Sequence, residues 1–200
     1  MGAYALNPPF GRKKPRSMGL PMYSAQVCIV TPDGDDAQAG QIGEIVVSSL
    51  LMMEGYWNDT ALIRKTLHNG WVRTGDLGRF DEDGHLWFMG RKKDIIVCAG
   101  NNISPMEVES ILLTHPSVGE ACVYGVTEID GIEQVHACVT AQSNTEQATE
   151  EELKEFAREH LAEYMVPCRI PYIDEAPRKG TGKVDRERLR LREETGMADL

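Results

Sequence analysis

The sequence lacks the patterns that define several classes of protein. Its five cysteines form no Cys-x-x-Cys pair and its five histidines show no metal-ligand spacing. We therefore expect reduced, buried or half-buried thiols, with no disulfide framework and no structural metal. No apolar run is long enough to cross a membrane. The first residues show no basic region followed by an apolar core, so we expect no signal peptide and a cytoplasmic location.

Positive charge is also scarce. Lysine and arginine number 21 against 31 acidic residues, giving a formal net charge of -10. A polyanionic partner would be repelled, which argues against nucleic acid as the ligand. The exception is a basic tail at residues 178–192, which reads either as a solvated helix face or as a functional segment.

The sequence pattern changes near Arg91, from mostly strands to a mixture of helices and strands, which predicts two modules. Residues 1–90 read as a mostly antiparallel β module, with short β-branched strands at 26–30 and 42–47. A tight hairpin turn is expected at 81–84. Residues 91–200 read as α+β.

Capping patterns predict the helices. The expected helices are 60–67 after Asp59, one beginning at Pro105 with a Ser104/Glu107 capping box, one with a Thr149/Glu152 capping box that ends at Pro167, and 185–192. Strands are expected at 71–72, 77–80, 85–89, 121–126, 135–141 and 169–173.

The first segment that packing alone does not explain is Thr-Gly-Asp at 74–76. A carboxylate held in such a turn between strands offers two acceptor oxygens, an arrangement suited to the hydroxyls of a ribose. The alternative is an Asx-turn in which Asp76 only satisfies nearby backbone amides.

The second segment, residues 90–109, places four consecutive charges in an apolar run. Arg91 supplies planar donors for ribose or phosphate oxygens. Gly100 allows a turn with close approach of a ligand or another chain. The alternative is a surface turn with ordinary solvated charges.

The third segment is Gly-Thr-Gly-Lys at 180–183. Two glycines bracket a flexible loop that presents Lys183, a compact cation suited to the negative charge that develops on phosphates in a transition state. The spacing is not that of a P-loop. The alternative is a basic loop preceding a basic helix.

In this order and spacing, the segments resemble the AMP-forming adenylating enzymes, which include acyl-CoA synthetases, peptide-synthetase adenylation domains and beetle luciferases. The resemblance covers nearly the whole chain. It rests on Gly-Glu-Ile-Val-Val at 43–47, Glu-Gly-Tyr-Trp-Asn at 54–58, Thr-Gly-Asp at 74–76, Gly-Arg-Lys-Lys-Asp at 90–94, Asn-Ile-Ser-Pro at 102–105, Glu-Val-Glu at 107–109 and Thr-Gly-Lys-Val-Asp-Arg at 181–186.

The resemblance implies a fold and a reaction. Residues 1–90 would be the last, β-barrel-like subdomain of a large N-terminal AMP-binding domain, and 91–200 its mobile α+β C-terminal domain. A carboxylate would attack the α-phosphate of ATP, with Mg²⁺ present, to give acyl-AMP and pyrophosphate. The thiol of CoA would then attack acyl-AMP and release AMP. The motif at 102–109 favours fatty or aromatic acid–CoA ligases over peptide-synthetase modules.

The resemblance also implies residue roles. Asp76 would bind the ribose hydroxyls, and Arg91 the ribose or phosphate. Lys183 would bridge acyl and phosphate oxygens as the catalytic residue. Lys93 falls at the hinge position, and the loop at 99–103, with Gly100, would face the pantetheine channel.

Two residues depart from the family pattern. Asn101 stands where many CoA ligases have Glu. Arg16 stands where Gly is usual in a Lys-Pro-x-Ser-x-Gly stretch, which can rearrange a turn.

The family's phosphate-binding loop, its aromatic-Gly-x-Thr-Glu motif and most of its acyl pocket lie upstream of these motifs. We therefore expect this chain to be incomplete for adenylation alone, as a fragment, a truncated gene product or one half of a split enzyme whose partner is an N-terminal adenylating half. The alternative is a non-catalytic nucleotide-binding or partner module that retains the fold. The sequence does not identify the carboxylic acid.

Overall fold

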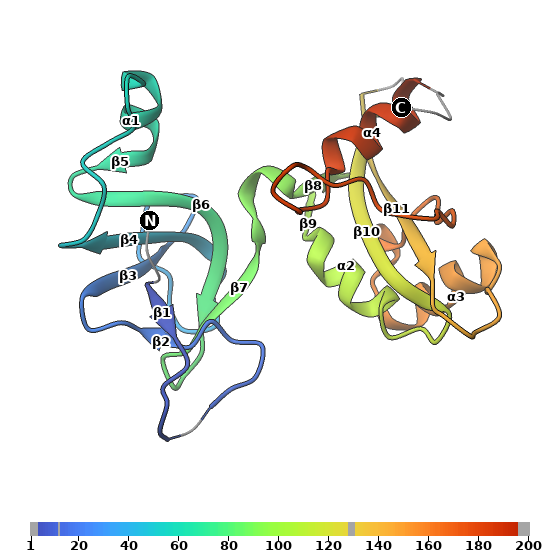
Figure 1. The fold of residues 1–200 in the computed structure, drawn as a ribbon, viewed down its shortest axis with the longest axis horizontal. Coiled ribbons are helices and arrows are strands. Elements are labelled where there is room, and N and C mark those ends of the chain that lie inside the picture. Colours follow the sequence, from blue (N-terminus) through green and yellow to red (C-terminus); the bar gives the residue numbers. More distant parts are fainter. Residues whose placement is uncertain (1–3, 12, 128–130, 196–200) are drawn as a thin grey trace. The chain divides into compact units, whose positions relative to one another are not determined.

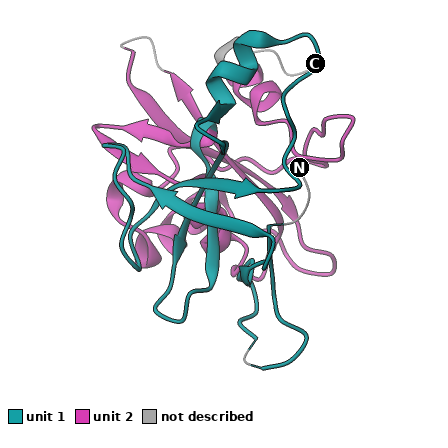
Figure 2. Cartoon of the chain, turned by 90° about the vertical axis from the view of Figure 1, so that its left-hand side faces the viewer, with its two compact units in different colours: residues 1–93 teal, residues 94–200 magenta. Residues whose placement is uncertain are grey.

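The structure, a computed structural model, describes residues 4–11, 13–127 and 131–195. The chain divides into two units, Met1–Lys93 and Asp94–Leu200, which are coloured separately in Figure 2. The first is rich in strands and the second mixes helices with strands (Figure 1). The predicted α+β fold, a β-barrel-like module followed by an α+β module, is confirmed.

Unit 1 is built on an antiparallel sheet that curls into part of a barrel (Figure 1). Its strand order is β3-β4-β6-β5, with β7 also paired to β6. The strands are β3 (Ala25–Val30), β4 (Gly43–Ser49), β5 (Leu67–His68), β6 (Trp71–Phe80) and β7 (Leu86–Arg91), and β1 (Ala5–Leu6) pairs separately with β2 (Leu20–Pro21). Ile29, Ile45, Val47 and Leu86 form the core on which the β1–β2 segment packs.

The single helix described in unit 1 begins as its cap predicts. α1 (Thr60–Thr66) follows Asp59, whose carboxylate accepts a hydrogen bond from the Leu62 amide at 2.9 Å. The strands predicted at 71–72 and 77–80 are parts of one continuous strand, β6. The intervening Thr-Gly-Asp stays in the sheet because it forms a bulge, described below.

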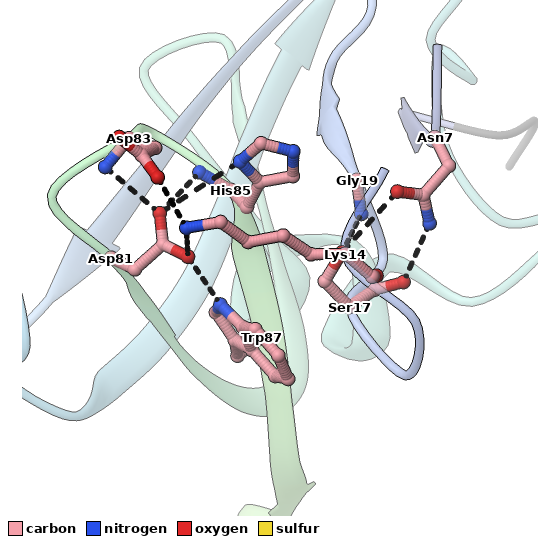
Figure 3. A network of polar contacts seen from close by, with 8 residues as sticks. All are labelled: Asn7, Lys14, Ser17, Gly19, Asp81, Asp83, His85 and Trp87. Carbon is pink, nitrogen blue, oxygen red and sulfur yellow. Dashed lines mark hydrogen bonds and ion pairs between the residues drawn. The ribbon is translucent and has the colours of Figure 1, made fainter. Parts of the chain in front are cut away.

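The turn from β6 to β7 is fixed by Asp81, as Figure 3 shows. Its carboxylate accepts hydrogen bonds from the amides of Asp83 and His85 at 3.0 and 2.9 Å, and from the Trp87 indole at 2.8 Å. Lys14 reaches the same carboxylate from the N-terminal segment at 2.6 Å. This hydrogen bond is the main reason why the pKa of Asp81 lies well below its usual range.

Unit 2 is centred on a two-stranded antiparallel sheet, β10 (Val118–Thr127) and β11 (Glu133–Ala141). Alternate residues of a strand face opposite sides, so one face carries Val123 and the other Cys122 and Tyr124. The first face packs on α2 (Pro105–Leu112), α3 (Glu150–His160) and the β8 (Ile96–Cys98)–β9 (Asn101–Ile103) hairpin. The second packs on Leu189 of α4 (Arg186–Thr195).

The two predicted capping boxes have different outcomes. Thr149 and Glu152 form theirs at the start of α3. α2 begins at Pro105 as predicted, but Ser104 makes no side-chain cap bond, so that capping box is wrong. The Glu107 amide, a usual donor to such a cap, instead donates to the Ser104 backbone carbonyl at 3.1 Å.

Two further boundaries differ from the predictions. α3 ends at His160, and a 3₁₀ turn (Glu163–Met165) separates it from Pro167. Residues 168–173 run parallel to β11 through backbone bonds such as Ala137 N–H to the Arg169 carbonyl at 2.9 Å, but form only isolated bridges. Pro171 has no N–H to donate, which limits regular pairing there.

The five cysteines differ in their burial. Cys122 and Cys138 are buried partners across β10 and β11, and Cys28 and Cys98 are half-buried. Cys168 is exposed, so the prediction that all five are buried or half-buried is wrong for that residue.

Candidate active site

A bulge in β6 presents Asp76. Ile45 of β4 stands opposite three residues of β6, 74–76, because the register shifts between the flanking pairs. Gly75, at the centre, has φ +72°, a conformation that glycine adopts without strain. The Thr74 hydroxyl donates to the Ile45 carbonyl at 2.7 Å and accepts from the Asp76 amide at 3.0 Å. Thr74 thus fixes the backbone from which the Asp76 side chain projects.

Arg91 lies directly opposite Asp76 in the β6–β7 ladder. Its Nε is 3.0 Å from Asp76 Oδ1, with side chains 42% and 16% exposed respectively. Burial, and then the Asp76 charge, raise the pKa of the Tyr4 hydroxyl, and Arg91 partly offsets this effect. Tyr4 therefore lies within range of both charges. Two residues predicted from separate motifs are therefore neighbours, beside a phenol that the sequence analysis missed.

Glu44 adds a second carboxylate on the adjoining strand β4. It is buried, and its Oε2 is 3.2 Å from the Arg73 guanidinium and 3.1 Å from Lys92 Nζ. Lys92 immediately precedes Lys93, an exposed residue of a short 3₁₀ turn (Lys92–Asp94) where unit 1 ends. Lys92 is thus tied to the sheet of unit 1.

Gly100 lies at the tip of the β8–β9 hairpin. Cys98 pairs with Asn101, leaving Ala99 and Gly100 as a two-residue connection with φ +48° and +81°. Positive φ at both positions is the pattern of a type I′ turn. A Cβ added at Gly100 would meet no atom within 4 Å, so backbone conformation rather than space explains the glycine.

The hairpin also corrects the predicted loop at 99–103. Asn101–Ile103 is strand β9, so only the two tip residues are outside regular structure. Ile96 and Ile103 anchor the hairpin in the core of unit 2. The tip is exposed.

Lys183 is exposed, and the segment that carries it is closed into a turn by backbone hydrogen bonds. The Lys179 amide donates to the Lys183 carbonyl and the Gly182 amide to the Lys179 carbonyl, both at 2.8 Å. Gly182, the residue before Lys183, has φ +80°, a conformation that glycine adopts without strain. Within the described part of the chain, Lys183 forms no ion pair with a carboxylate, whereas Lys179 lies 3.4 Å from Asp185.

The candidate residues therefore fall into two groups. Asp76 and Arg91 form one cluster in unit 1, whereas Gly100 and Lys183 belong to unit 2. Over residues 4–11, 13–127 and 131–195, no three His, Cys, Asp or Glu side chains are grouped to hold a metal ion. In those same ranges, no helix combines the length and apolar character needed to span a bilayer.

The model of the AMP-binding enzyme C-terminal domain matches residues 107–183. This match, with the fold and the relatives described next, shows that the chain is homologous to the C-terminal portion of AMP-forming adenylating enzymes. The family resemblance drawn from the motifs is thereby confirmed.

Among curated relatives, a 2-succinylbenzoate–CoA ligase of Bacillus licheniformis is 39% identical over 184 residues. That alignment covers 92% of this chain but only 38% of the ligase, so the chain spans little more than a third of the relative's length. Similar solved structures include the following two. The o-succinylbenzoate CoA synthetase of Bacillus subtilis in complex with its acyl-adenylate intermediate has 34% identity and a TM-score of 0.79, covering 88% of this chain and 35% of that one. The amide bond synthetase McbA of Marinactinospora thermotolerans has 36% identity and a TM-score of 0.82, covering 88% and 36%.

Proposed function

We propose that this chain supplies the C-terminal part of an ATP-dependent, AMP-forming acid–CoA ligase. The observation that carries the proposal is the Asp76–Arg91 pair, held at 3.0 Å on neighbouring strands in a chain homologous to adenylate-forming enzymes. In the first step, a carboxylate oxygen of the acid attacks the α-phosphorus of ATP and pyrophosphate leaves. In the second, the CoA sulfur attacks the acyl carbon and AMP leaves.

Asp76 is proposed to accept hydrogen bonds from the ribose hydroxyls. The Thr74 bridge fixes its backbone, and Arg91 orients the carboxylate through Oδ1. Arg91 is 42% exposed, which leaves part of its guanidinium accessible to a ribose or phosphate oxygen. Both groups are ordered before the nucleotide arrives, which lowers the entropy lost on binding.

Lys183 is proposed as the catalytic residue of the adenylation step. Its ammonium group would stabilise the charge that develops on the acyl and α-phosphate oxygens. The closed turn holds its backbone while the side chain stays exposed. Lys93 is proposed as the hinge, and Gly100 as part of the surface that meets the pantetheine arm of CoA. We infer that Mg²⁺ arrives with the phosphates of ATP, because the described residues offer it no ligand cluster.

The acid is proposed to be aromatic. Two of the relatives described above are named for succinylbenzoate and none for a fatty acid, so a role in fatty acid metabolism has no support among them. McbA is named an amide bond synthetase, which makes an amine the alternative acceptor to the CoA thiol.

A second candidate is a non-catalytic module that binds a nucleotide or a partner subunit. The Asp76–Arg91 cluster lies wholly within unit 1 and could hold a nucleotide without Lys183 of unit 2, which is the observation that favours this candidate. Catalysis, not nucleotide binding alone, therefore distinguishes the two functions.

The test is formation of acyl-adenylate and CoA ester from ATP, Mg²⁺, CoA and a panel of aromatic and aliphatic acids, with amines as alternative acceptors. The purified chain is assayed alone and with the N-terminal portion of the Bacillus licheniformis ligase. We expect no turnover by the chain alone and acyl-adenylate formation by the pair. Lys183→Ala should lower that rate by about 10²–10³-fold, whereas Lys179→Ala, in the same turn, should lower it much less.

Nucleotide binding is measured separately by calorimetry with AMP. Asp76→Asn should weaken AMP binding, whereas Asp83→Asn, elsewhere on unit 1, should not. Binding of AMP without turnover in any combination would favour the non-catalytic module. Absence of both would refute the proposed function.

A further inference from the structure

Two arginines bracket the turn that carries Lys183. Arg178 lies on one side and Arg186 on the other, and each is paired with a glutamate from a different element of unit 2. The ends of the turn are joined by the Asp185 amide, which donates to the Pro177 carbonyl at 2.7 Å. The lysine turn, defined here as residues 177–186, is therefore a closed unit with two charged attachment points.

Arg186 is the more buried attachment. Its Nη2 is 2.6 Å from Glu109 Oε1 and its Nε donates to the Val123 carbonyl at 3.1 Å. Glu109, from α2, also accepts the Val123 amide at 2.9 Å through the same oxygen. Burial alone would lower the pKa of Arg186, but the Glu109 carboxylate, and then Asp94, raise it above its usual range. The pair thus joins α2, β10 and the start of α4.

The same guanidinium reaches the start of unit 2. Arg186 Nη1 is 3.8 Å from Asp94 Oδ2, and Asp94 is the first residue after the boundary. Arg186 therefore connects the lysine turn with the residue next to Lys93.

Arg178 is the more exposed attachment. It binds Glu120 of β10 through both carboxylate oxygens at 2.7 and 2.9 Å, and donates to the Gly182 carbonyl at 3.2 Å. These side chains are 38% and 49% exposed, against 30% and 12% for Arg186 and Glu109. Exposed pairs contribute little, whereas removing one partner of a buried pair leaves a desolvated charge. Glu120 thus provides the matched control for Glu109.

We propose that Glu109 and Arg186 are positioning residues that hold the lysine turn at a fixed place relative to Asp94. A backbone rotation at Lys93 would then carry Lys183 with unit 2 as a rigid body. This inference deepens the proposed function, on which the catalytic meaning of Lys183 rests. The attachment itself is a property of this chain and can be tested without turnover.

The primary test is residue-resolved amide hydrogen exchange in the 200-residue chain, read by NMR. Three amides report on the turn, namely Lys179, Gly182 and Asp185. Glu109→Gln should accelerate their exchange about tenfold, equivalent to about 1.4 kcal/mol of local opening. The β10–β11 amides should keep their protection, apart from the Val123 amide, which itself donates to Glu109. Arg186→Lys should give a smaller acceleration, because lysine keeps the positive charge but lacks the several planar N–H donors of the guanidinium. Glu120→Gln should change exchange of the three amides by less than about threefold.

Two results would overturn the proposal. One is unchanged exchange of the three amides in Glu109→Gln. The other is equal acceleration across the turn and the β10–β11 ladder, which would show a general loss of stability instead of local positioning.

The functional arm measures acid-dependent exchange of pyrophosphate into ATP in the assembly with the N-terminal portion. Glu109→Gln should lower kcat about tenfold, with KM for ATP within about twofold, since Glu109 does not touch the nucleotide. Lys183→Ala separates the hypotheses. If that substitution leaves the exchange unchanged, the proposed role of Lys183 fails, and the attachment is judged on hydrogen exchange alone.

Discussion

Arg16 adopts a backbone conformation that favours glycine. It has φ +70° and follows Pro15, while the Ser17 amide donates to the Lys14 carbonyl at 3.2 Å. Proline at the second position and positive φ at the third define a type II turn, whose third position prefers Gly or Asn. Arg16 therefore occupies the turn position that prefers glycine, and its side chain makes the left-handed backbone conformation unfavourable.

Replacing Arg16 by glycine should stabilise unit 1. A non-glycine residue in the left-handed region costs about 1–2 kcal/mol, and the flexibility of glycine in the unfolded chain returns part of that gain. We expect Arg16→Gly to raise the free energy of unfolding by up to about 1 kcal/mol in urea titrations. Arg16→Ala, which keeps a Cβ and removes the charge, should give no comparable gain. Equal gains from both would assign the effect to the side chain.

Asp81 makes unit 1 sensitive to acid. Because its pKa is depressed in the folded state, its stabilising effect is present above the unfolded value of about 3.9. The effect is lost as the pH falls through the folded pKa. Asp81→Asn should therefore make the free energy of unfolding fall less steeply with decreasing pH below about pH 4. The change in slope should correspond to at most one proton taken up on unfolding. Urea midpoints between about pH 2 and 6 measure this, with Asp83→Asn, the exposed partner of Lys14, as control.

At the scale of elements, the type I′ turn of the β8–β9 hairpin invites a paired test. Gly100→Ala should destabilise unit 2 by about 1–2 kcal/mol, because alanine would enter the left-handed region. Ala99→Asn should stabilise it by about 0.5–1 kcal/mol, since Asn-Gly is the preferred pair in this turn. Thermal unfolding of the variants checks both directions. Similar small effects at both positions would argue against the turn type.

Sequence patterns predicted most elements because their causes are local. Asp59 and Thr149 cap the helices that follow them, and the Asp81 turn joins β6 to β7. The Ser104 hydroxyl does not cap α2 as predicted, because the Glu107 amide donates to the Ser104 backbone carbonyl instead. Local rules also divided β6 into two strands. Gly75 indicates a turn on local grounds, because the sequence does not show that it forms a bulge opposite Ile45 of β4.

The candidate site depends on contacts between residues distant in sequence. Asp76 and Arg91 were predicted separately, and only the strand register makes them partners. Glu109 and Arg186 lay within recognised motifs, but their pairing across 77 positions is not visible in either motif. Glu44 gave a local signal, a carboxylate inside the apolar run of β4, which a search for paired buried charges could have used.

At the scale of the whole chain, Lys93 lies at the boundary between the two units. Lys92 is tied to Glu44 in unit 1, whereas Asp94 lies near Arg186 in unit 2. Each neighbour of Lys93 therefore has an ion-pair partner in its own unit. Hinges are commonly a few residues that absorb backbone rotation between such fixed parts.

Lys93→Pro tests whether rotation at this position serves the second half-reaction. Proline fixes φ near −65° and so removes one of the two dihedrals available to the hinge. In the assembly with the N-terminal portion, we expect acid-dependent pyrophosphate exchange to stay within about threefold while transfer of the acyl group from acyl-AMP to CoA falls by tenfold or more, as expected for a conformational step. Lys93→Ala, which removes the charge but keeps the dihedral freedom, should leave both half-reactions close to wild type. If Lys93→Ala reproduces the defect, the side chain matters rather than the rotation. If proline slows both half-reactions equally, Lys93 is a structural residue and the hinge lies elsewhere.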